Sequence, residues 1–193
     1  MNKVILASGS PRRRELLSKY NLEPIIVIPQ VEEKISPEER VDQIAMALAF
    51  EKAKQVADKF NNGEIVIGAD TIVACEGKIL GKPKDEYEAR EMIRFLSGKT
   101  HEVVTGISIV KANSNIKIID YEKTLVKFRK LSNEKIENYI STKEYVDKAG
   151  AYGIQGIGGL LVEKIDGCYF NVVGLPISKL DALLEKHFNI RLL

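Results

Sequence analysis

The sequence lacks the features that would place a protein in a specialised class. It has no tryptophan, only two cysteines and only two histidines. The cysteines, Cys75 and Cys168, lie far apart along the chain, so they form neither a disulfide framework nor a zinc-ligand spacing. We expect both to be reduced thiols in the core of a cytoplasmic protein.

The sequence also lacks an excess of charge and a long apolar run. With 29 Lys and Arg against 27 Asp and Glu, the formal net charge is +2, which argues against a polycationic nucleic-acid binder. No stretch approaches the roughly 18 consecutive apolar residues of a membrane span. The apolar run Val4–Ala7 is too short for the roughly 7–15 residues of a signal-peptide core. We therefore expect no nucleic-acid partner and no membrane association.

What is present is typical of one soluble globular domain. The chain has 193 residues, 45% of them hydrophobic and 29% charged. At about 150 residues per domain, this length predicts a single domain over residues 1–193.

Strand-like and helix-like segments alternate along the chain. Strands are expected at 4–7, 25–28, 65–75, 79–80, 102–111, 117–128 and 160–165, and helices at about 11–20, 37–60, 86–97, 133–141 and 176–187. Three of the helix starts are marked by Ser10 before Pro11, by Ser36 before Pro37 and by Asp85. The polar link 112–115 makes the two long strands a predicted antiparallel hairpin. Parallel βα units combined with a hairpin indicate an α/β fold with a mixed sheet.

A candidate anion-binding loop, Ser8–Arg14, lies between the first strand and the first helix. Backbone N–H groups and the positive end of a helix dipole favour an anion there. The hydroxyls of Ser8 and Ser10 and the guanidinium groups of Arg12 and Arg13 could bind phosphate oxygens. The alternative is a capped surface helix with a solvated basic first turn. Neither G-x-x-x-x-G-K-[ST] nor G-x-G-x-x-G occurs in the chain.

Asp70 interrupts an otherwise apolar strand, 65–75. A carboxylate at such a position is costly unless it is paired, coordinated or functional. Gly68 and Ala69 next to it would leave room for a ligand. A structural aspartate at a strand break is an equally good interpretation of the residue alone.

Lys52 is predicted to face the core. It follows Val41 by eleven residues, which at about 100° per residue returns it to the apolar stripe of the helix. A buried lysine needs an anionic partner, either a protein carboxylate or a ligand phosphate. The alternative is a lysine whose stem is buried while its amine reaches water.

Three weaker signals complete the candidates. Lys82 lies between a glycine and a proline, where an ordinary turn lysine is the alternative. Glu32 and Glu33 could hold a divalent cation or pair with basic residues, or be ordinary surface charge. Gln155 is the one side-chain amide in the glycine-rich segment 150–159, and it could hydrogen-bond the edge of a base, unless that segment is only a flexible connector.

Together these segments resemble the Maf family, also called septum formation inhibitor Maf-like proteins. The matching stretches occur in family order and span nearly the whole chain. They are Leu6–Arg13, Glu51–Ala53, Gly68–Thr71, Gly81–Pro83, Gly150–Gly156 and Asn171–Pro176.

The resemblance implies an elongated α/β fold with a central cleft across a mixed sheet, like the inosine triphosphate pyrophosphatase class. It implies a hydrolase that cleaves nucleoside triphosphates between the α and β phosphates, releasing a nucleoside monophosphate and pyrophosphate with Mg²⁺ or Mn²⁺. Asp70 matches the family's proton acceptor, and Asp70 with Glu33 would hold the metal. The substrate-binding positions would be Ser8, Ser10, Arg12, Arg13, Glu33, Lys52, Thr71, Lys82 and Gln155.

The residues Arg12, Thr71 and Gln155 resemble the dTTP/UTP branch of the family. The alternatives are a 7-methyl-GTP pyrophosphatase, an enzyme for modified pyrimidine triphosphates, or a non-catalytic nucleotide-binding regulator of septum formation. The residues alone leave open whether Asp70 is a general base or a metal ligand. The expected partner is a small-molecule nucleoside triphosphate, and a homodimer is also considered.

Overall fold

The structure is a computed structural model that describes residues 3–20, 22–31 and 39–193. Its strands are β1 (Val4–Ala7), β2 (Ile25–Val27), β3 (Ile65–Cys75), β4 (Lys78–Leu80), β5 (Thr100–Lys111), β6 (Lys117–Phe128) and β7 (Val162–Asp166). Its α-helices are α1 (Pro11–Ser18), α2 (Val41–Ala57), α3 (Glu86–Leu96), α4 (Asn133–Ser141), α5 (Tyr169–Val173) and α6 (Ile177–Phe188), with 3₁₀ turns η1 (Ala149–Ala151) and η2 (Ile157–Leu161).

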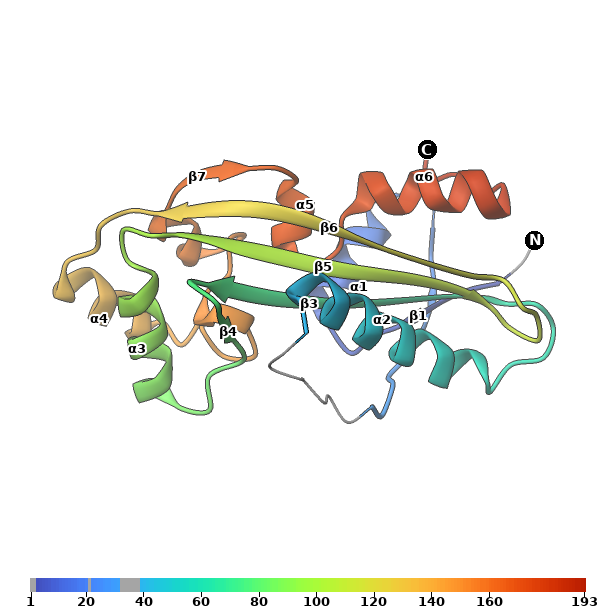
Figure 1. Cartoon of the computed structure of the whole chain (residues 1–193), viewed down its shortest axis with the longest axis horizontal. Helices are drawn as coiled ribbons and strands as arrows, with labels where there is room; N and C mark the ends of the chain where they lie inside the picture. The colour runs from blue at the N-terminus through green and yellow to red at the C-terminus, as the bar shows by residue number, and fades with distance from the viewer. Residues whose placement is uncertain (1–2, 21, 32–38) are drawn as a thin grey trace. The chain divides into compact units, whose positions relative to one another are not determined.

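The strands form one mixed sheet, which confirms the predicted α/β class (Figure 1). Across the described residues the order is β2-β1-β3-β5-β6-β7, with β4 paired to β3. β1 runs parallel to both β2 and β3, whereas β4 is antiparallel to β3 and β7 is antiparallel to β6. The predicted hairpin of two long strands is present as β5 and β6.

The chain folds into two compact units. Unit 1 comprises residues 1–70, 105–122 and 174–193, and unit 2 comprises residues 71–104 and 123–173. Strands β3, β5 and β6 contribute residues to both.

Two element boundaries differ from the prediction. The helix expected from about residue 37 begins at Val41, because Arg40 has extended backbone angles and occupies the N-cap; residues 36–38 lie outside the described part of the chain. The strand expected at 160–165 begins at Val162, because Ile157–Leu161 form a 3₁₀ turn. The five-residue α5 was not predicted, because it is too short for a helical apolar period.

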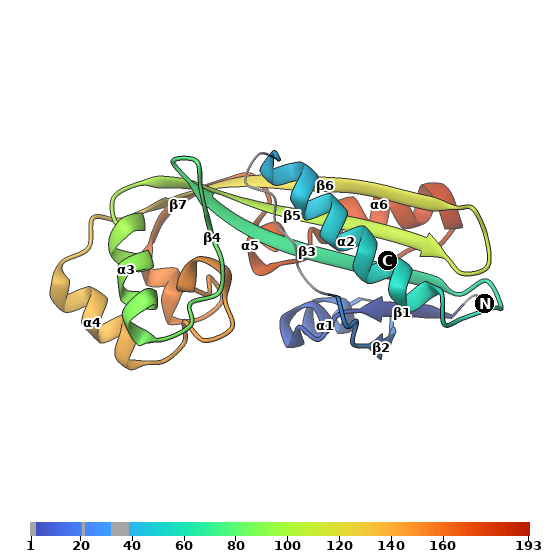
Figure 2. The same cartoon turned by 60° about the horizontal axis from the view of Figure 1, so that its bottom comes forward.

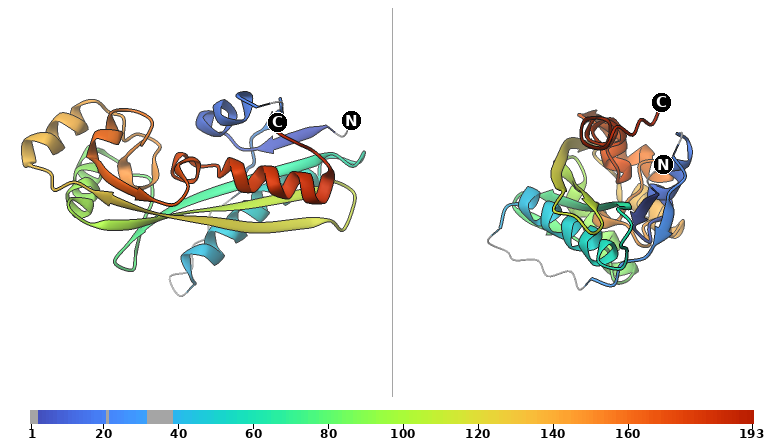
Figure 3. Two further views of the ribbon diagram at one scale, coloured as in Figure 1. Left: turned by 90° about the horizontal axis from the view of Figure 1, so that it is seen from above. Right: turned by 90° about the vertical axis from the view of Figure 1, so that its right-hand side faces the viewer.

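In unit 1, α2 and α6 cover opposite faces of the strands (Figures 2 and 3). The core between α2 and the strands contains small and β-branched residues, Ile5, Ala7, Ala53, Val56, Ala57, Val66, Val110 and Ala112. α2 approaches closely because two glycines face it. A Cβ on Gly68 would lie 2.3 Å from the Ala49 oxygen, and a Cβ on Gly106 would lie 2.1 Å from the Ala45 oxygen.

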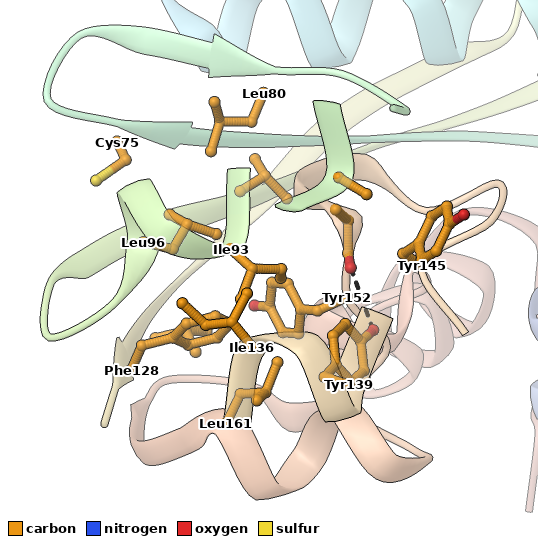
Figure 4. Packing of buried hydrophobic residues seen from close by; sticks show 14 of the residues in the cluster. Cys75, Leu80, Ile93, Leu96, Phe128, Ile136, Tyr139, Tyr145, Tyr152 and Leu161 are labelled. Carbon is orange, nitrogen blue, oxygen red and sulfur yellow. Dashed lines mark hydrogen bonds between the residues drawn. The ribbon is translucent and has the colours of Figure 1, made fainter. Parts of the chain in front are cut away.

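In unit 2, α3, α4 and the segment 149–161 enclose a second core (Figure 4). Tyr139 and Tyr152 are both buried within it, and the Tyr139 hydroxyl donates a 3.1 Å hydrogen bond to the Ala151 oxygen. Cys75 is buried here and burial raises the pKa of its thiol, whereas Cys168 is only half-buried. Both thiols are free, but the prediction that both lie in the core is wrong for Cys168, which sits in the turn between β7 and α5.

His101 in this core predicts a loss of stability in acid. It is 2% exposed, packs edge-on against Phe128 and Tyr152, and shares a 2.8 Å hydrogen bond with the Tyr152 hydroxyl through Nε2. Among the described residues its Nδ1 has no hydrogen-bond partner. Burial lowers the pKa of His101 from 6.5 to about 4, so the folded protein resists the protonation that the unfolded chain accepts.

The resulting stabilisation is complete above pH 6.5 and is lost as the pH falls from 6.5 to about 4. The free energy of unfolding should fall by up to about 3 kcal/mol across that window. Urea titrations of wild type and His101→Gln at several pH values would measure the slope of the unfolding free energy against pH. The variant should lose the part of this slope that His101 contributes. His187, exposed in the last turn of α6, supplies the control, because His187→Gln removes an imidazole that is not buried. Equal slopes in wild type and His101→Gln would contradict the assignment.

Every helix within residues 3–20, 22–31 and 39–193 is too short or too polar to cross a membrane.

Candidate functional site

The loop after β1 is held in shape by its own side chains. Ser8 is buried, and its hydroxyl oxygen accepts hydrogen bonds from the Ser10 N–H at 3.1 Å and from the Arg13 guanidinium at 3.3 Å. Arg13 also donates through Nε to the Gly174 oxygen at 2.7 Å. Helix α1 then begins at Pro11, with Ser10 at the N-cap as predicted, although the Ser10 side chain makes no capping bond. The loop therefore presents a helix N-terminus with a preorganised backbone, which suits an anion.

Strand register places this loop beside the part of β3 that carries Asp70. Ala7, the last residue of β1, lies opposite Gly68 in the parallel pair. The chain leaves the sheet at Ser8, while β3 continues for two more residues to Asp70. The carboxyl end of a parallel strand next to a longer neighbour is a common ligand position in α/β folds.

Asp70 and Lys52 form an ion pair inside unit 1. Side chains two residues apart share a face of a strand, and Gly68 faces the backbone of α2, so Asp70 faces α2 as well. There its Oδ1 accepts a hydrogen bond from Lys52 Nζ. The two side chains are only 10% and 13% exposed, so each charge compensates the other where water is scarce. The prediction that Lys52 faces inward is confirmed, and a protein carboxylate is among its partners.

The role predicted for Gly68 is wrong. The missing side chain does not make room for a ligand, because the backbone of α2 at Ala49 and Ala53 occupies that space. Gly68 instead allows the helix to approach closely enough for Lys52 to reach Asp70.

Thr71, Lys82 and Gln155 belong to unit 2. Thr71 follows Asp70 in β3 and is half-buried, whereas Lys82 and Gln155 are exposed. Lys82 comes two residues after β4, which pairs antiparallel with β3 through Leu80 opposite Val73. The Gly150 N–H donates to the Gly81 oxygen at 3.1 Å, which joins the Gly81–Pro83 motif to the glycine-rich segment that carries Gln155.

The structure does not describe every predicted position. Glu32 and Glu33 lie outside the described residues. Arg12 is half-buried in the first turn of α1. A hollow of about 270 Å³ in unit 1, near Lys54, Phe60 and Lys117, includes none of the predicted site residues, so the sequence motifs do not meet there.

Within the described residues, a divalent cation at this site would have few protein ligands. No group of three or more His, Cys, Asp or Glu lies together within the described ranges. Asp70 is a single, largely buried carboxylate. Mg²⁺ is commonly held by one or two carboxylates plus substrate phosphates and water, so this donor set fits a cation that arrives with a triphosphate better than a caged structural ion.

Sequence reasoning missed two residues that organise these motifs. Asn171 is fully buried and donates through Nδ2 to the Val103 oxygen at 2.9 Å and to Thr124 Oγ1 at 3.0 Å, which ties α5 to β5 and β6. Glu144 accepts hydrogen bonds from the backbone of the glycine-rich segment. No spacing rule marks either one, although the buried asparagine within an apolar stretch was a visible signal.

Comparison with known proteins identifies the family to which the chain belongs. The family model described as "Maf-like protein" matches residues 3–187, which is nearly the whole chain and includes both units. The chain belongs to the Maf family. The resemblance seen in the sequence is thereby confirmed.

Curated Maf relatives match the chain from end to end. The protein of Alkaliphilus oremlandii (strain OhILAs) is 52% identical over 193 residues, 100% of both chains, and is named dTTP/UTP pyrophosphatase. Proteins of Clostridioides difficile (strain 630), 52% identical over 98% of this chain and 97% of its own, and of Thermoanaerobacter sp. (strain X514), 53% identical over 99% and 100%, bear the same name.

Among solved structures, a nucleoside-triphosphatase, or dITP/XTP pyrophosphatase, from Mycobacterium abscessus matches with a TM-score of 0.40 and 13% identity. The match covers 73% of this chain and 94% of that one. This likeness is weak, and the α/β assignment rests on the strand pairing of the Maf chain itself.

Proposed function

We propose that the chain is a nucleoside triphosphate pyrophosphatase that hydrolyses dTTP and UTP to the nucleoside monophosphate and pyrophosphate. The observation that carries the proposal is the buried Lys52–Asp70 pair beside the Ser8–Arg13 loop, in a chain about half identical over its full length to relatives with that name. The pair supplies a carboxylate in a fixed place, and the loop supplies donors for phosphate.

In the proposed reaction a water molecule attacks the α-phosphorus and its proton passes to the Asp70 carboxylate. The bond between the α-phosphorus and the oxygen bridging to the β-phosphate breaks, and pyrophosphate leaves with that oxygen. Lys52 holds the carboxylate in place through its hydrogen bond. Ser8, Ser10, Arg12, Arg13 and Lys82 are proposed to bind phosphate oxygens and to stabilise the negative charge that develops on the leaving group.

The divalent cation, Mg²⁺ or Mn²⁺, is part of the proposal. Asp70 together with Glu33, which lies outside the described residues, would hold it with the phosphate oxygens. When bound, it would neutralise phosphate charge and lower the pKa of a bound water.

Base recognition is proposed for Arg12, Thr71 and Gln155. A threonine hydroxyl and a glutamine amide both donate and accept hydrogen bonds, as a pyrimidine edge requires. The dTTP/UTP name of the relatives supports this choice over a 7-methyl-GTP enzyme.

A screen for pyrophosphate release tests the proposed function directly. Wild-type protein with Mg²⁺ should turn over dTTP and UTP with a kcat/KM at least about tenfold above that for purine triphosphates and 7-methyl-GTP. Controls without metal and with EDTA should lose the activity. Preference for 7-methyl-GTP would contradict the proposed dTTP/UTP specificity. No turnover of any triphosphate would favour a non-catalytic nucleotide-binding regulator.

We also propose that residues 1–193 act as one domain, because the family model includes both units. A cytoplasmic location is proposed, and the two free thiols support it. The homodimer stays a prediction, which light scattering would test against the 21.6 kDa of one chain.

A further inference from the structure

Glu144 binds the backbone of the segment that carries Gln155. Its Oε2 accepts a hydrogen bond from the Ile157 N–H at 2.7 Å, and its Oε1 accepts one from the Gly158 N–H at 3.2 Å. Two adjacent backbone donors on one carboxylate restrain the chain immediately after Gln155.

The glycines on either side of Gln155 fit this contact. A Cβ on Gly156 would lie 2.5 Å from Glu144 Oε2, and a Cβ on Gly153 would lie 2.7 Å from Lys148 Cε. A side chain at either position would displace the Glu144 carboxylate or the end of the Lys148 side chain from its place. The glycines in this segment therefore leave space for the Glu144 and Lys148 side chains next to the backbone. These contacts do not support the alternative that the segment is only a flexible connector.

The chain that carries Glu144 is itself tightly held. Lys143, Asp147 and Ala151 all have positive φ angles, of 57°, 59° and 62°, which are uncommon for residues other than glycine. Lys148 Nζ donates to the backbone oxygen of Glu144, and the Tyr139 hydroxyl donates to that of Ala151. Glu144 therefore acts from a rigid base.

One end of the segment is also joined to the Lys82 motif. The Gly150 N–H donates to the Gly81 oxygen at 3.1 Å. Glu144 at one end and Gly81 at the other leave residues 151–156 as a short span, on which the exposed Gln155 amide is presented.

We propose that Glu144 is a positioning residue for base recognition, which sets the place of the Gln155 amide by holding the backbone of Ile157 and Gly158. This rests on the proposed function, in which Gln155 reads the base. In this proposal the effect of Glu144 on the base passes through Gln155.

The variant Glu144→Gln tests the proposal with a small change. The amide keeps one acceptor oxygen, but its NH₂ group would face the other backbone N–H, so one of the two hydrogen bonds is lost. For dTTP, KM should rise about tenfold with little change in kcat, and the preference for pyrimidine over purine triphosphates should shrink by a similar factor. Glu163→Gln is the matched control, because Glu163 is a surface carboxylate of unit 2 whose partner is the Lys127 side chain.

A double-mutant cycle separates positioning from general destabilisation. Added to Gln155→Ala, Glu144→Gln should cost less than about a further twofold in kcat/KM, because the side chain it positions is already gone. If the two substitutions instead lower kcat/KM by factors that multiply in the double variant, the proposal would be overturned.

Amide hydrogen exchange supplies a readout that does not depend on activity. At least one of the N–H groups of Ile157 and Gly158 should exchange at least about tenfold faster in Glu144→Gln, and both should exchange at the wild-type rate in Glu163→Gln. Unchanged exchange in Glu144→Gln would refute the backbone contact. A wild-type protein that turns over neither dTTP nor UTP would refute the proposed function instead, and the exchange rates would still decide whether Glu144 holds the loop.

Discussion

Asp70→Asn should lower kcat for pyrophosphate release from dTTP by about 10³-fold, within the range usual for removal of a general base. Asparagine has nearly the same size and keeps an acceptor oxygen towards Lys52, but it cannot take a proton from water. Steady-state kinetics with excess Mg²⁺ would measure the loss. Full activity in Asp70→Asn would contradict the role proposed for this carboxylate.

Asp58→Asn is a matched control for that experiment. Asp58 also pairs with a lysine of α2, Lys54, at 2.6 Å, but those side chains are 60% and 50% exposed. A solvated pair of this kind contributes little, so Asp58→Asn should keep both activity and stability. Asp70→Asn leaves a buried ammonium without its carboxylate and should also lower the free energy of unfolding by about 3 kcal/mol. Activity is therefore compared at a temperature at which circular dichroism shows both variants folded.

The elements with strong local signals could be predicted from the sequence. Ser10 with Pro11 marked the start of α1, and Asp85 caps α3 through a 2.8 Å bond from the Glu88 N–H. The helical period placed Lys52 on the buried face of α2 without any knowledge of its partner. These predictions succeeded because caps and apolar periods act over a few residues.

The failures that bear most on the site involve contacts between segments distant in sequence. The sequence shows a glycine at 68, but whether a ligand or a helix fills the space beside it depends on where α2 lies. In the same way, Glu144 binds the backbone 13 residues further on, a contact that no local pattern encodes. The start of α2 was misplaced because a serine-proline pair outweighed Arg40, which has no intrinsic preference for an N-cap.

Gly68→Ala and Gly106→Ala should both destabilise unit 1 strongly, although each adds only one methyl group. Both added methyl groups would collide with backbone atoms of α2, at 2.3 Å and 2.1 Å, and backbone cannot turn aside as a flexible side chain can. Ala45, Ala49 and Ala53 are all fully buried against the strands, so this face of the helix has no free space into which it could move. Each variant should lose about 3 kcal/mol of unfolding free energy, at the upper end for overpacking. In thermal melts this corresponds to a fall in Tm of roughly 6–12 °C for a chain of this size.

Gly81→Ala is the control for stability. A Cβ at Gly81 meets nothing within 4 Å, and its backbone φ is not in the positive range. Alanine there restricts the unfolded chain without a clash, so Tm should stay the same or rise slightly. A Tm of Gly68→Ala or Gly106→Ala equal to that of the wild type would show that α2 can shift without loss of stability. A shift of α2 at Gly68 would also move Lys52 relative to Asp70, because Lys52 lies between Ala49 and Ala53, which contact Gly68. Folded Gly68→Ala protein should therefore lose more kcat than folded Gly106→Ala protein. The close approach of one helix thus sets both the stability of unit 1 and the geometry of its charged pair.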